Sequence, residues 1–293
     1  MLLPPMLRRH IESRLGSSVT RADSAGAGFT PGFASVLTCA DGTRHFVKAA
    51  SKVAQRPFAD AYREEARKLR ALPGGLPVPR LLWCHEDDLW VVLALEHVDG
   101  TNPGRPWAHD QLDACLDSLE VLADRLTPPP MRLQSFAEEM ADCLEGWDHV
   151  RRTSPELDHL DEAAELAGGF AGVTTGDTLV HTDARDDNFL LTDGGALLCD
   201  WNWPVVGAPW IDTVVLLIPA HGDGVDADAV LARRRLTRDV VRDDVDALIA
   251  LVCGYYLKAK DDPVPNSSPY IRLHQGWYAD AAWDWLSRRR GWR

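Results

Sequence analysis

The sequence is poor in lysine, and its six cysteines are scattered along the chain. Only five of the 31 basic residues are lysines, and the formal net charge is −13. Such an acidic chain lacks the basic surface on which nucleic-acid binding depends, so we expect no nucleic-acid partner. Because no two cysteines are close enough to form a CxxC pair, a disulfide framework and a cysteine zinc site are both disfavoured.

Long apolar runs are also missing. The longest, Val214 to Ala220, is too short to cross a bilayer, and the N-terminal residues lack the apolar region of a signal peptide. We therefore expect a cytoplasmic protein with no membrane partner. A chain of 293 residues, 45% of them hydrophobic, can build one large domain or two smaller ones. Its oligomeric state is left open.

The order of apolar patterns predicts two lobes. Strand patterns dominate the first hundred residues, with Asp41-Gly42 as a hairpin turn, and residues 58–72 have the apolar spacing of a helix. After the Gly- and Pro-rich segment 97–106, helical patterns prevail. They cover roughly 110–126, 134–149, 156–170, 209–219, 225–236, 239–259 and 275–290. We predict an α+β protein with a small β-rich lobe (1–98), which holds one long helix, and a larger, mainly helical lobe (99–293).

One stretch of the helical half, 179–201, places many polar residues between two apolar runs. His181, Asp183 and Asn188 form the pattern H-x-D-x-x-x-x-N there, and Asp200 follows twelve residues after Asn188. Phosphoryl transfer needs a carboxylate that orients the attacking hydroxyl and accepts its proton, and hard oxygen ligands for Mg²⁺. Asp183 fits the first requirement, and Asn188 and Asp200 fit the second. By itself the pattern is weak, since a polar loop before a hairpin, or less easily a zinc site, has the same residues.

Residues upstream of this stretch offer a cation for a nucleotide. Lys48 ends an apolar strand and could hold phosphates, although a solvent-facing lysine on an edge strand would look the same. In the next helix Glu65 can face inward and pair with Lys48, and Glu64 is the alternative partner. Ahead of Lys48 runs a glycine-rich loop whose amides could approach phosphates. The nucleotide-binding residues predicted in this loop are Gly28, Phe29, Thr30 and Gly32.

Further positions are predicted to support the nucleotide and the polar loop. The backbone near Glu96 and Val98, just before the linker, could hydrogen-bond to an adenine ring. Asp212 precedes an apolar helix, so it could begin that helix as an N-cap-like residue. It could also turn inward and accept hydrogen bonds from the loop that carries Asp183, and the two roles are compatible. His181 is assigned to the support of the same loop.

This ordered set resembles the aminoglycoside phosphotransferase and choline kinase superfamily, small-molecule relatives of the protein kinases. The resemblance covers about residues 20–220. Asp200 is followed by tryptophan rather than by the Phe-Gly of protein kinases, and no long activation segment follows. The resemblance implies a bilobal protein-kinase-like fold that uses Mg²⁺ with ATP or GTP. It also implies that Asp183 is the catalytic aspartate, that Asn188 and Asp200 bind the metal, and that Lys48 holds the α- and β-phosphates.

The position after the catalytic aspartate departs from the family. Many members have a leucine there, whereas this chain has Ala184 followed by Arg185. Arg185 could reach the substrate or a phosphate, or it could pair with Asp186 or Asp187. It is therefore a possible substrate-binding residue.

The C-terminal segment is rich in tryptophan and aspartate, and it could form part of the acceptor site. In this superfamily the C-terminal helices help to wall the acceptor pocket. Aromatic faces and carboxylates suit a cationic or sugar-like acceptor, so we predict that Trp277, Asp280 and Asp284 contact substrate wherever they point inward. The alternative is an amphipathic helix whose aromatic residues pack on the core.

We interpret the chain as an Mg²⁺-dependent kinase that moves the γ-phosphate of ATP or GTP to a hydroxyl of a small molecule. Aminoglycoside-like compounds, amino sugars and amino alcohols are the acceptors considered. A nucleotide-binding pseudokinase with a regulatory role is the alternative, and a metal-dependent hydrolase that uses the same acids is a minor one. Slow nucleotide hydrolysis that is lost on Asp183→Ala would favour the kinase over the pseudokinase, whereas activity without nucleotide would indicate the hydrolase.

Overall fold

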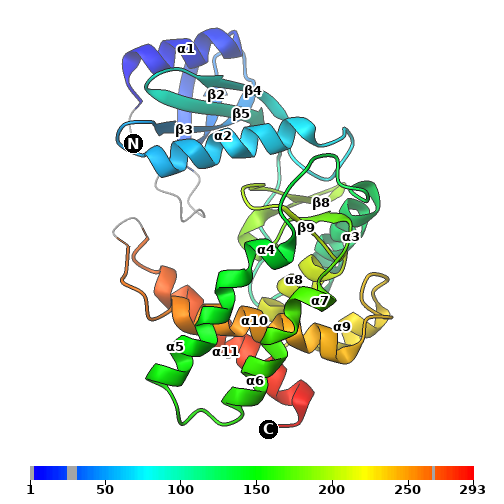
Figure 1. Cartoon of the computed structure of the whole chain (residues 1–293). Helices are drawn as coiled ribbons and strands as arrows, with labels where there is room; N and C mark the ends of the chain where they lie inside the picture. The colour runs from blue at the N-terminus through cyan, green and yellow to red at the C-terminus, as the bar shows by residue number, and fades with distance from the viewer. Residues whose placement is uncertain (1–2, 25–31, 266–267) are drawn as a thin grey trace. The chain divides into compact units, whose positions relative to one another are not determined.

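The computed structural model describes residues 3–24, 32–265 and 268–293, which form two compact units (Figure 1). The N-terminal unit lies within Met1–Gly74, Val78–Gly100 and Cys199–Asn202, and the C-terminal unit comprises Gly75–Pro77, Thr101–Leu198 and Trp203–Arg293. A sheet dominates the first unit and helices dominate the second. The predicted α+β class is therefore confirmed.

An antiparallel five-stranded sheet, in the order β1-β2-β3-β5-β4, forms the centre of the N-terminal unit. Its strands are β1 (Val19–Ser24), β2 (Phe33–Cys39), β3 (Arg44–Ser51), β4 (Leu81–Glu86) and β5 (Trp90–Glu96). Helices α1 (Pro5–Leu15) and α2 (Arg56–Ala71) pack against this sheet. The sequence patterns did not predict α1, which begins with a proline in the first helical position, where a missing N–H costs nothing.

The two helices cover opposite faces of the sheet (Figure 1). On the α1 face, Leu7 and Ile11 are buried in one apolar cluster with Val47 and Ala49 of β3. Successive side chains of a strand point to opposite faces. Lys48, which stands between these two residues, therefore faces α2.

The C-terminal unit consists mainly of helices, with two short strand pairs. Its helices are α3 (His109–Arg125), α4 (Phe136–Glu139), α5 (Glu145–Thr153), α6 (Leu160–Gly168), α7 (Phe170–Val173), α8 (Ile211–Gly222), α9 (Ala227–Arg233), α10 (Arg242–Ala259) and α11 (Ile271–Arg290), with 3-10 turns η1 (Ala141–Leu144) and η2 (Asp186–Asn188). Strand β6 (Thr178–Val180) pairs with β9 (Val205–Gly207), and β7 (Phe189–Thr192) pairs with β8 (Gly195–Leu198). None of the helices in the described ranges has both the length and the apolar character of a membrane span.

The centre of this unit is α10, which packs against α5, α6 and α11. Gly146 of α5 and Gly254 of α10 lie so close together that a Cβ on Gly146 would overlap the carbonyl group of Gly254. Trp147 is buried beside them, and its indole N–H donates to the carbonyl oxygen of Ala250 at 3.1 Å. Small residues at the crossing of the two helices thus make room for a large one.

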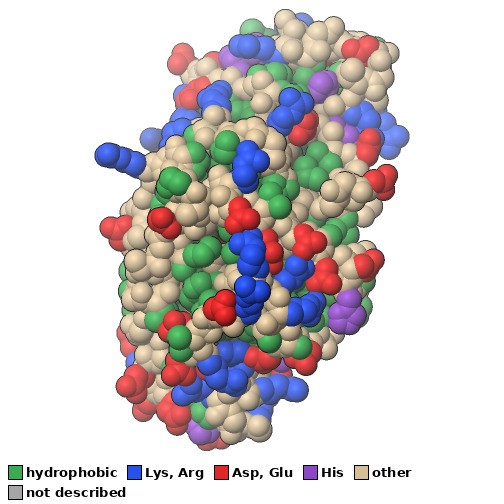
Figure 2. Space-filling model, turned by 90° about the vertical axis from the view of Figure 1, so that its right-hand side faces the viewer, with side chains coloured by type: hydrophobic (Ala, Val, Ile, Leu, Met, Phe, Trp, Pro, Cys, Tyr) green, Lys and Arg blue, Asp and Glu red, His purple; other side chains and the backbone are tan. Residues whose placement is uncertain are grey.

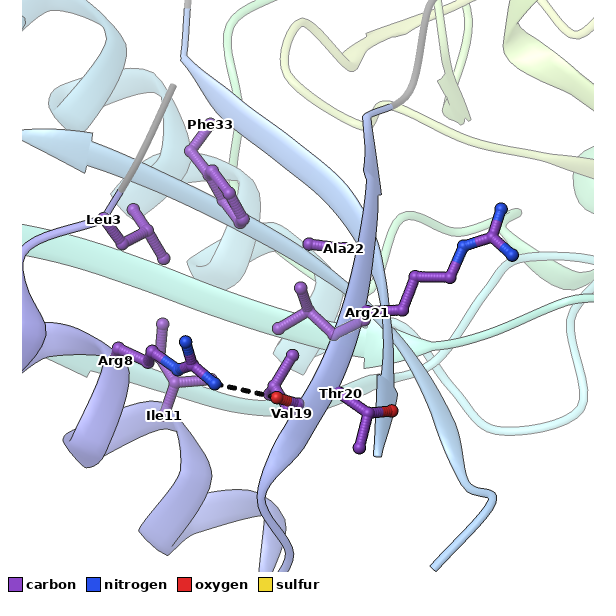
Figure 3. A pocket seen from close by; sticks show the side chains of 9 residues that line it. Leu3, Arg8, Ile11, Val19, Thr20, Arg21, Ala22 and Phe33 are labelled. Carbon is purple, nitrogen blue, oxygen red and sulfur yellow. Dashed lines mark hydrogen bonds between the residues drawn. The ribbon is translucent and has the colours of Figure 1, made fainter. Parts of the chain in front are cut away.

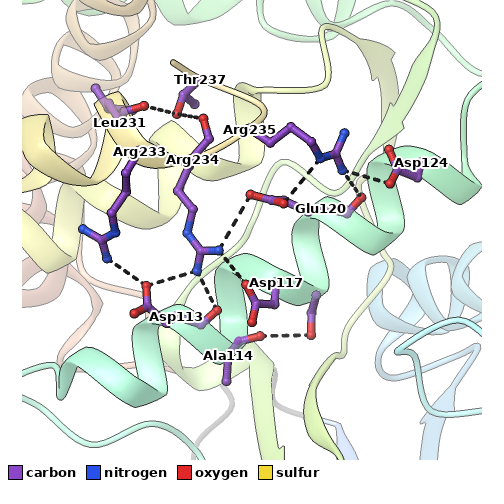
Figure 4. Close-up of polar contacts among 11 residues, drawn as sticks. Asp113, Ala114, Asp117, Glu120, Asp124, Leu231, Arg233, Arg234, Arg235 and Thr237 are labelled. Atoms are coloured by element: carbon purple, nitrogen blue, oxygen red, sulfur yellow. Dashed lines mark hydrogen bonds and ion pairs between the residues drawn. The ribbon is translucent and has the colours of Figure 1, made fainter. Parts of the chain in front are cut away.

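Three consecutive arginines fasten the end of α9 to the acidic helix α3 (Figure 4). Arg233 and Arg234 contact Asp113 at 2.8 and 3.1 Å, and Arg235 contacts Asp124 at 2.9 Å. Carboxylates one turn apart on α3 would repel each other, and the arginines offset this repulsion. Basic side chains also lie among acidic ones on the face that Figure 2 shows, instead of forming a patch of one sign.

A shallow groove of about 200 Å³ lies on the N-terminal unit between α1 and strands β1 and β2 (Figure 3). Its lining is mainly apolar and includes Leu3, Ile11 and Phe33, while Arg8 donates to the carbonyl oxygen of Val19 at its edge. The predicted phosphate-binding residue Lys48 is not among the lining residues and faces the other side of the sheet. This groove is therefore not a candidate for the nucleotide site.

Candidate active site

Lys48 and Glu65 form the buried ion pair that the sequence predicts. The Lys48 ammonium donates to both carboxylate oxygens of Glu65, at 2.8 and 2.9 Å. Glu64 instead pairs with Arg67 at 2.9 Å, on the exposed side of α2. Burial alone would lower the pKa of Lys48, but Glu65 and Asp200 outweigh it and raise that pKa. Lys48 is therefore held in its charged form.

Asp200 belongs to the same unit and completes a cluster with this pair. Its Oδ1 accepts from the Lys48 ammonium at 2.8 Å and from the side-chain amide of Asn202 at 2.5 Å. The backbone of Asp200 is left-handed, with φ of 63°, a conformation that aspartate adopts more readily than most residues. Lys68 donates to the carbonyl oxygen of Asn202, and this contact helps to hold the turn that follows Asp200.

In the C-terminal unit, Asp183 and Asn188 are in direct contact. The side-chain amide of Asn188 donates to the carbonyl oxygen of Asp183 at 2.8 Å and to its Oδ2 at 3.0 Å. The 3-10 turn η2 makes this approach possible, since the backbone N–H of Asn188 donates to the carbonyl oxygen of Arg185 at 3.0 Å. With its nitrogen on Asp183, the amide of Asn188 directs its oxygen away from Asp183.

Asp212 holds the backbone that precedes Asp183. Its two carboxylate oxygens accept the backbone N–H groups of His181 and Thr182, both at 2.7 Å. Trp210 is the N-cap of α8, so Asp212 turns inward rather than capping the helix. Burial raises the pKa of the Asp212 carboxyl, and these backbone donors and His181 oppose that rise. The His181 ring in turn contacts the backbone N–H of Asp183 at 3.3 Å, so the loop is held at successive residues.

Arg185 points back onto its own loop. Its Nε lies 3.0 Å from Oδ1 of Asp183, and its Nη2 lies 3.3 Å from Oδ2 of Asp187. Of the pairings considered from the sequence, the one with Asp187 is present. The contact with Asp183 has no sequence signal beyond the spacing of two residues, because it depends on the turn η2.

Asp187 is expected to make the protein less stable as the pH rises. Burial raises the pKa of its carboxyl to about 6, and Arg185 offsets only part of that rise. A carboxyl with a folded-state pKa above its unfolded value stabilises the fold fully below the unfolded pKa, here 3.8. That contribution is lost as the pH rises through the folded-state pKa. The shift corresponds to about 3 kcal/mol, so Asp187→Asn should be more stable than the wild type at pH 7.

Thermal unfolding at pH 4.5 and pH 7 measures this effect. The difference in melting temperature, Asp187→Asn minus wild type, should be larger at pH 7 than at pH 4.5 by roughly 5 °C or more. His274 has a pKa lowered by burial, Arg185 and Arg105 to about 4, so it titrates in the same window with the opposite sign. Because His274 is common to both proteins, its effect cancels in the comparison. Melting curves that shift in parallel would contradict the assignment.

The predicted acceptor residues of α11 gather at a hollow of about 660 Å³ formed with α8 and α9. Trp277, Asp280 and Asp284 all line it. The Arg105 guanidinium covers one face of the Trp277 ring at 3.8 Å, and Asp284 contacts His221 at 2.9 Å. Two of the three side chains are thus already engaged within the protein.

A different residue of α11 reaches the loop that carries Asp183. His274 Nε2 lies 3.5 Å from Nη1 of Arg185, and Asp284 follows ten residues later, about 15 Å further along the helix axis. His274 was not among the predicted site residues, because a single histidine on an aromatic helix has no distinctive sequence pattern. The first turn of α11 therefore faces the loop, and the later turns face the hollow.

The structure describes only some of the other residues that were predicted to bind the nucleotide. Gly28, Phe29 and Thr30 lie outside the described residues, and Gly32 lies against the Tyr62 ring of α2. The backbone N–H of Glu96 donates to the carbonyl oxygen of Arg80 at 2.9 Å, within the unit. That donor is therefore already in use.

These features together are those of a protein-kinase-like phosphotransferase: a lysine–glutamate pair beneath a five-stranded sheet, and an H-x-D-x-x-x-x-N loop fixed by a buried aspartate. The chain belongs to the phosphotransferase enzyme family, whose model matches residues 33–246. As a member of this family it is a small-molecule kinase. Among curated protein sequences, none matches the chain significantly.

Solved structures with the same fold include an aminoglycoside phosphotransferase from Alicyclobacillus acidocaldarius, with a TM-score of 0.63 and 16% identity over 99% of this chain and 96% of that one. The choline kinase LicA from Streptococcus pneumoniae has a TM-score of 0.60 and 13% identity over 95% and 98% of the two chains. The amicoumacin kinase hAmiN, solved in complex with AMP-PNP, Ca²⁺ and Ami, has a TM-score of 0.54 and 15% identity over 86% of each chain. At these identities the likeness shows the fold alone.

Proposed function

We propose that the protein transfers the γ-phosphate of ATP or GTP, bound with Mg²⁺, to a hydroxyl group of a small molecule. The main support for this proposal is the way Asp183 is held in place. Asn188 donates to its carboxylate, and Asp212 accepts hydrogen bonds from the backbone that precedes it. Such double support suits a group that must meet a reacting hydroxyl in one orientation. The acceptor oxygen attacks the γ-phosphorus, its proton passes to Asp183, and the bond to the β–γ bridging oxygen breaks.

Lys48 and Glu65 are assigned to the phosphates of the donor. A buried ammonium held by a carboxylate is a fixed positive charge, and a fixed charge stabilises phosphate oxygens without reorganising during the reaction. We assign nucleotide binding to residues 1–98, where Val98 offers the backbone for the base, since the N–H of Glu96 is already bonded. Residues 99–293 are assigned to catalysis and acceptor binding. The dependence on ATP or GTP is consistent with a cytoplasmic enzyme.

Asn188 and Asp200 have the chemistry to hold Mg²⁺. A carboxylate and an amide oxygen are hard ligands of the kind that this ion prefers. The fit is supported by the Asn188 side chain, which uses its nitrogen on Asp183 and so presents its oxygen elsewhere. It is also supported by Asp200, whose left-handed backbone and contact with Asn202 fix its carboxylate. Bound Mg²⁺ would neutralise charge on the phosphates during transfer.

The acceptor is proposed to be a hydroxylated compound such as an aminoglycoside, an amino sugar or an amino alcohol. The carboxylates and tryptophan along α11 give that helix an aromatic and acidic surface, which suits a cationic group. Asp280 is exposed, so it is the strongest candidate of the three for a contact with a large acceptor.

Binding and transfer assays test the proposed function. We expect ATP or GTP with Mg²⁺ to raise the melting temperature, because a ligand bound only by the folded state stabilises it. A panel of aminoglycosides, amino sugars, choline-like amines and macrolides should then reveal an acceptor that gains one phosphate, detected by mass. Nucleotide binding without slow hydrolysis or transfer to any acceptor would favour a pseudokinase instead.

A further inference from the structure

Arg185 joins the catalytic loop to α11 through a single guanidinium group. Its three nitrogens are divided among three partners: Nε lies 3.0 Å from Asp183, Nη2 lies 3.3 Å from Asp187, and Nη1 lies 3.5 Å from His274. Only 16% of the side chain is exposed. A buried guanidinium placed between two carboxylates is typical of a residue that fixes geometry rather than one that waits for a ligand.

Aromatic residues of α10 and α11 lie near this arginine. The His274 ring lies 4.6 Å from the Tyr278 ring, which lies 5.0 Å from the Tyr256 ring. Burial, Arg185 and Arg105 lower the pKa of His274 to about 4, so at neutral pH the imidazole is neutral and can accept from the guanidinium. Because the Arg185 side chain is largely buried, its attraction to the carboxylates is stronger than it would be in water.

The two oxygens of the Asp183 carboxylate are therefore contacted from different sides. Asn188 donates to Oδ2 at 3.0 Å, and Arg185 forms an ion pair with Oδ1 at 3.0 Å. Without the Arg185 charge, the carboxylate could turn more easily about its terminal bond, which is a soft torsion. The Arg185 charge beside Oδ1 opposes this rotation, so the acceptor hydroxyl meets the carboxylate in one preferred orientation.

We propose that Arg185 is a positioning residue that orients the Asp183 carboxylate for the acceptor, and that His274 and Asp187 hold Arg185 in place. This inference rests on the proposed function of Asp183. It assigns to Arg185 a contact with a catalytic group and not with the nucleotide or the acceptor. Removing Arg185 should therefore lower kcat and leave the KM values of both substrates nearly unchanged.

Steady-state kinetics of Arg185→Ala test this proposal. The Asn188 contact remains in the variant, so we expect a loss of about 10- to 100-fold in kcat, with both KM values within about twofold of the wild type. Addition of methylguanidinium should restore part of the lost kcat, whereas the same concentration of ammonium chloride should not. Arg233→Ala, which removes an exposed arginine of the same unit, is the matched control and should keep full activity.

Each other outcome overturns the proposal. An unchanged kcat means that Arg185 does not position Asp183, and a raised acceptor KM with normal kcat means that it binds the acceptor. If Arg185→Ala does not fold, Arg185→Lys takes its place, because lysine keeps the charge but cannot bridge both carboxylates. A kcat equal to that of the wild type in Arg185→Lys would also overturn the proposal. Failure of the proposed function gives a different result. In that case the wild type itself is inactive, whereas failure of the Arg185 proposal gives an active wild type and an equally active variant.

Discussion

Replacing Asp183 with asparagine should abolish phosphate transfer while the protein still binds nucleotide. Asparagine has the same shape, so Asn188 and the loop backbone keep most of their packing, but an amide cannot accept the proton of the acceptor hydroxyl. A general base contributes about 10²- to 10⁴-fold to the rate, and the fixed carboxylate of Asp183 also orients the acceptor. We expect kcat to fall by about 10³-fold or more, measured by phosphate transfer to the acceptor found in the panel.

Asp177→Asn is the matched control for this variant. It makes the same substitution six residues earlier, just ahead of β6, outside the H-x-D-x-x-x-x-N pattern. Its kcat should equal that of the wild type. The melting temperature of Asp183→Asn should rise with Mg²⁺ and nucleotide as it does in the wild type. If transfer survives in Asp183→Asn at more than about a tenth of the wild-type rate, Asp183 is not the base.

The parts of the site that could be predicted from the sequence are those that depend on local spacing. The register of α2 placed Glu65 on the inward face, and the ion pair with Lys48 is present. The sequence could not decide the role of Asp212, because its position along the chain allowed it either to cap α8 or to accept hydrogen bonds from the loop. The structure decides for hydrogen bonding because α8 begins at Ile211 with Trp210 as its cap.

The parts that could not be predicted depend on how separate elements meet. The contact of His274 with Arg185 joins residues 89 positions apart, and neither residue has a pattern that indicates the other. The expected helix over 134–149 is divided into α4, η1 and α5. A capping box of Ser135 and Glu138 fixes where α4 begins, but it does not set where that helix ends. Apolar periodicity continues across such a break, so it cannot reveal where the backbone turns.

Asp200→Asn is expected to have the second large effect, a loss of metal-dependent transfer. The variant removes the negative charge that Asp200 would offer to Mg²⁺, and it also weakens the contact with Lys48. Metal stabilisation of transferring phosphates amounts to several kcal/mol, so kcat should fall by about 10³-fold. A non-hydrolysable ATP analogue should stabilise the variant to nearly the same degree with and without Mg²⁺, whereas Mg²⁺ should increase the stabilisation of the wild type.

Glu65→Gln separates the metal role of Asp200 from its contact with Lys48. Both variants remove one carboxylate partner of Lys48, but only Asp200 is a proposed metal ligand. Glu65→Gln removes one partner of Lys48 and leaves the other, Asp200, in place. We expect weaker binding of the analogue, and a less stable fold because the pair is buried. The extra stabilisation that Mg²⁺ gives should persist in this variant. If Mg²⁺ increases the stabilisation of Asp200→Asn as much as that of Glu65→Gln, Asp200 acts through Lys48 alone and does not bind the metal.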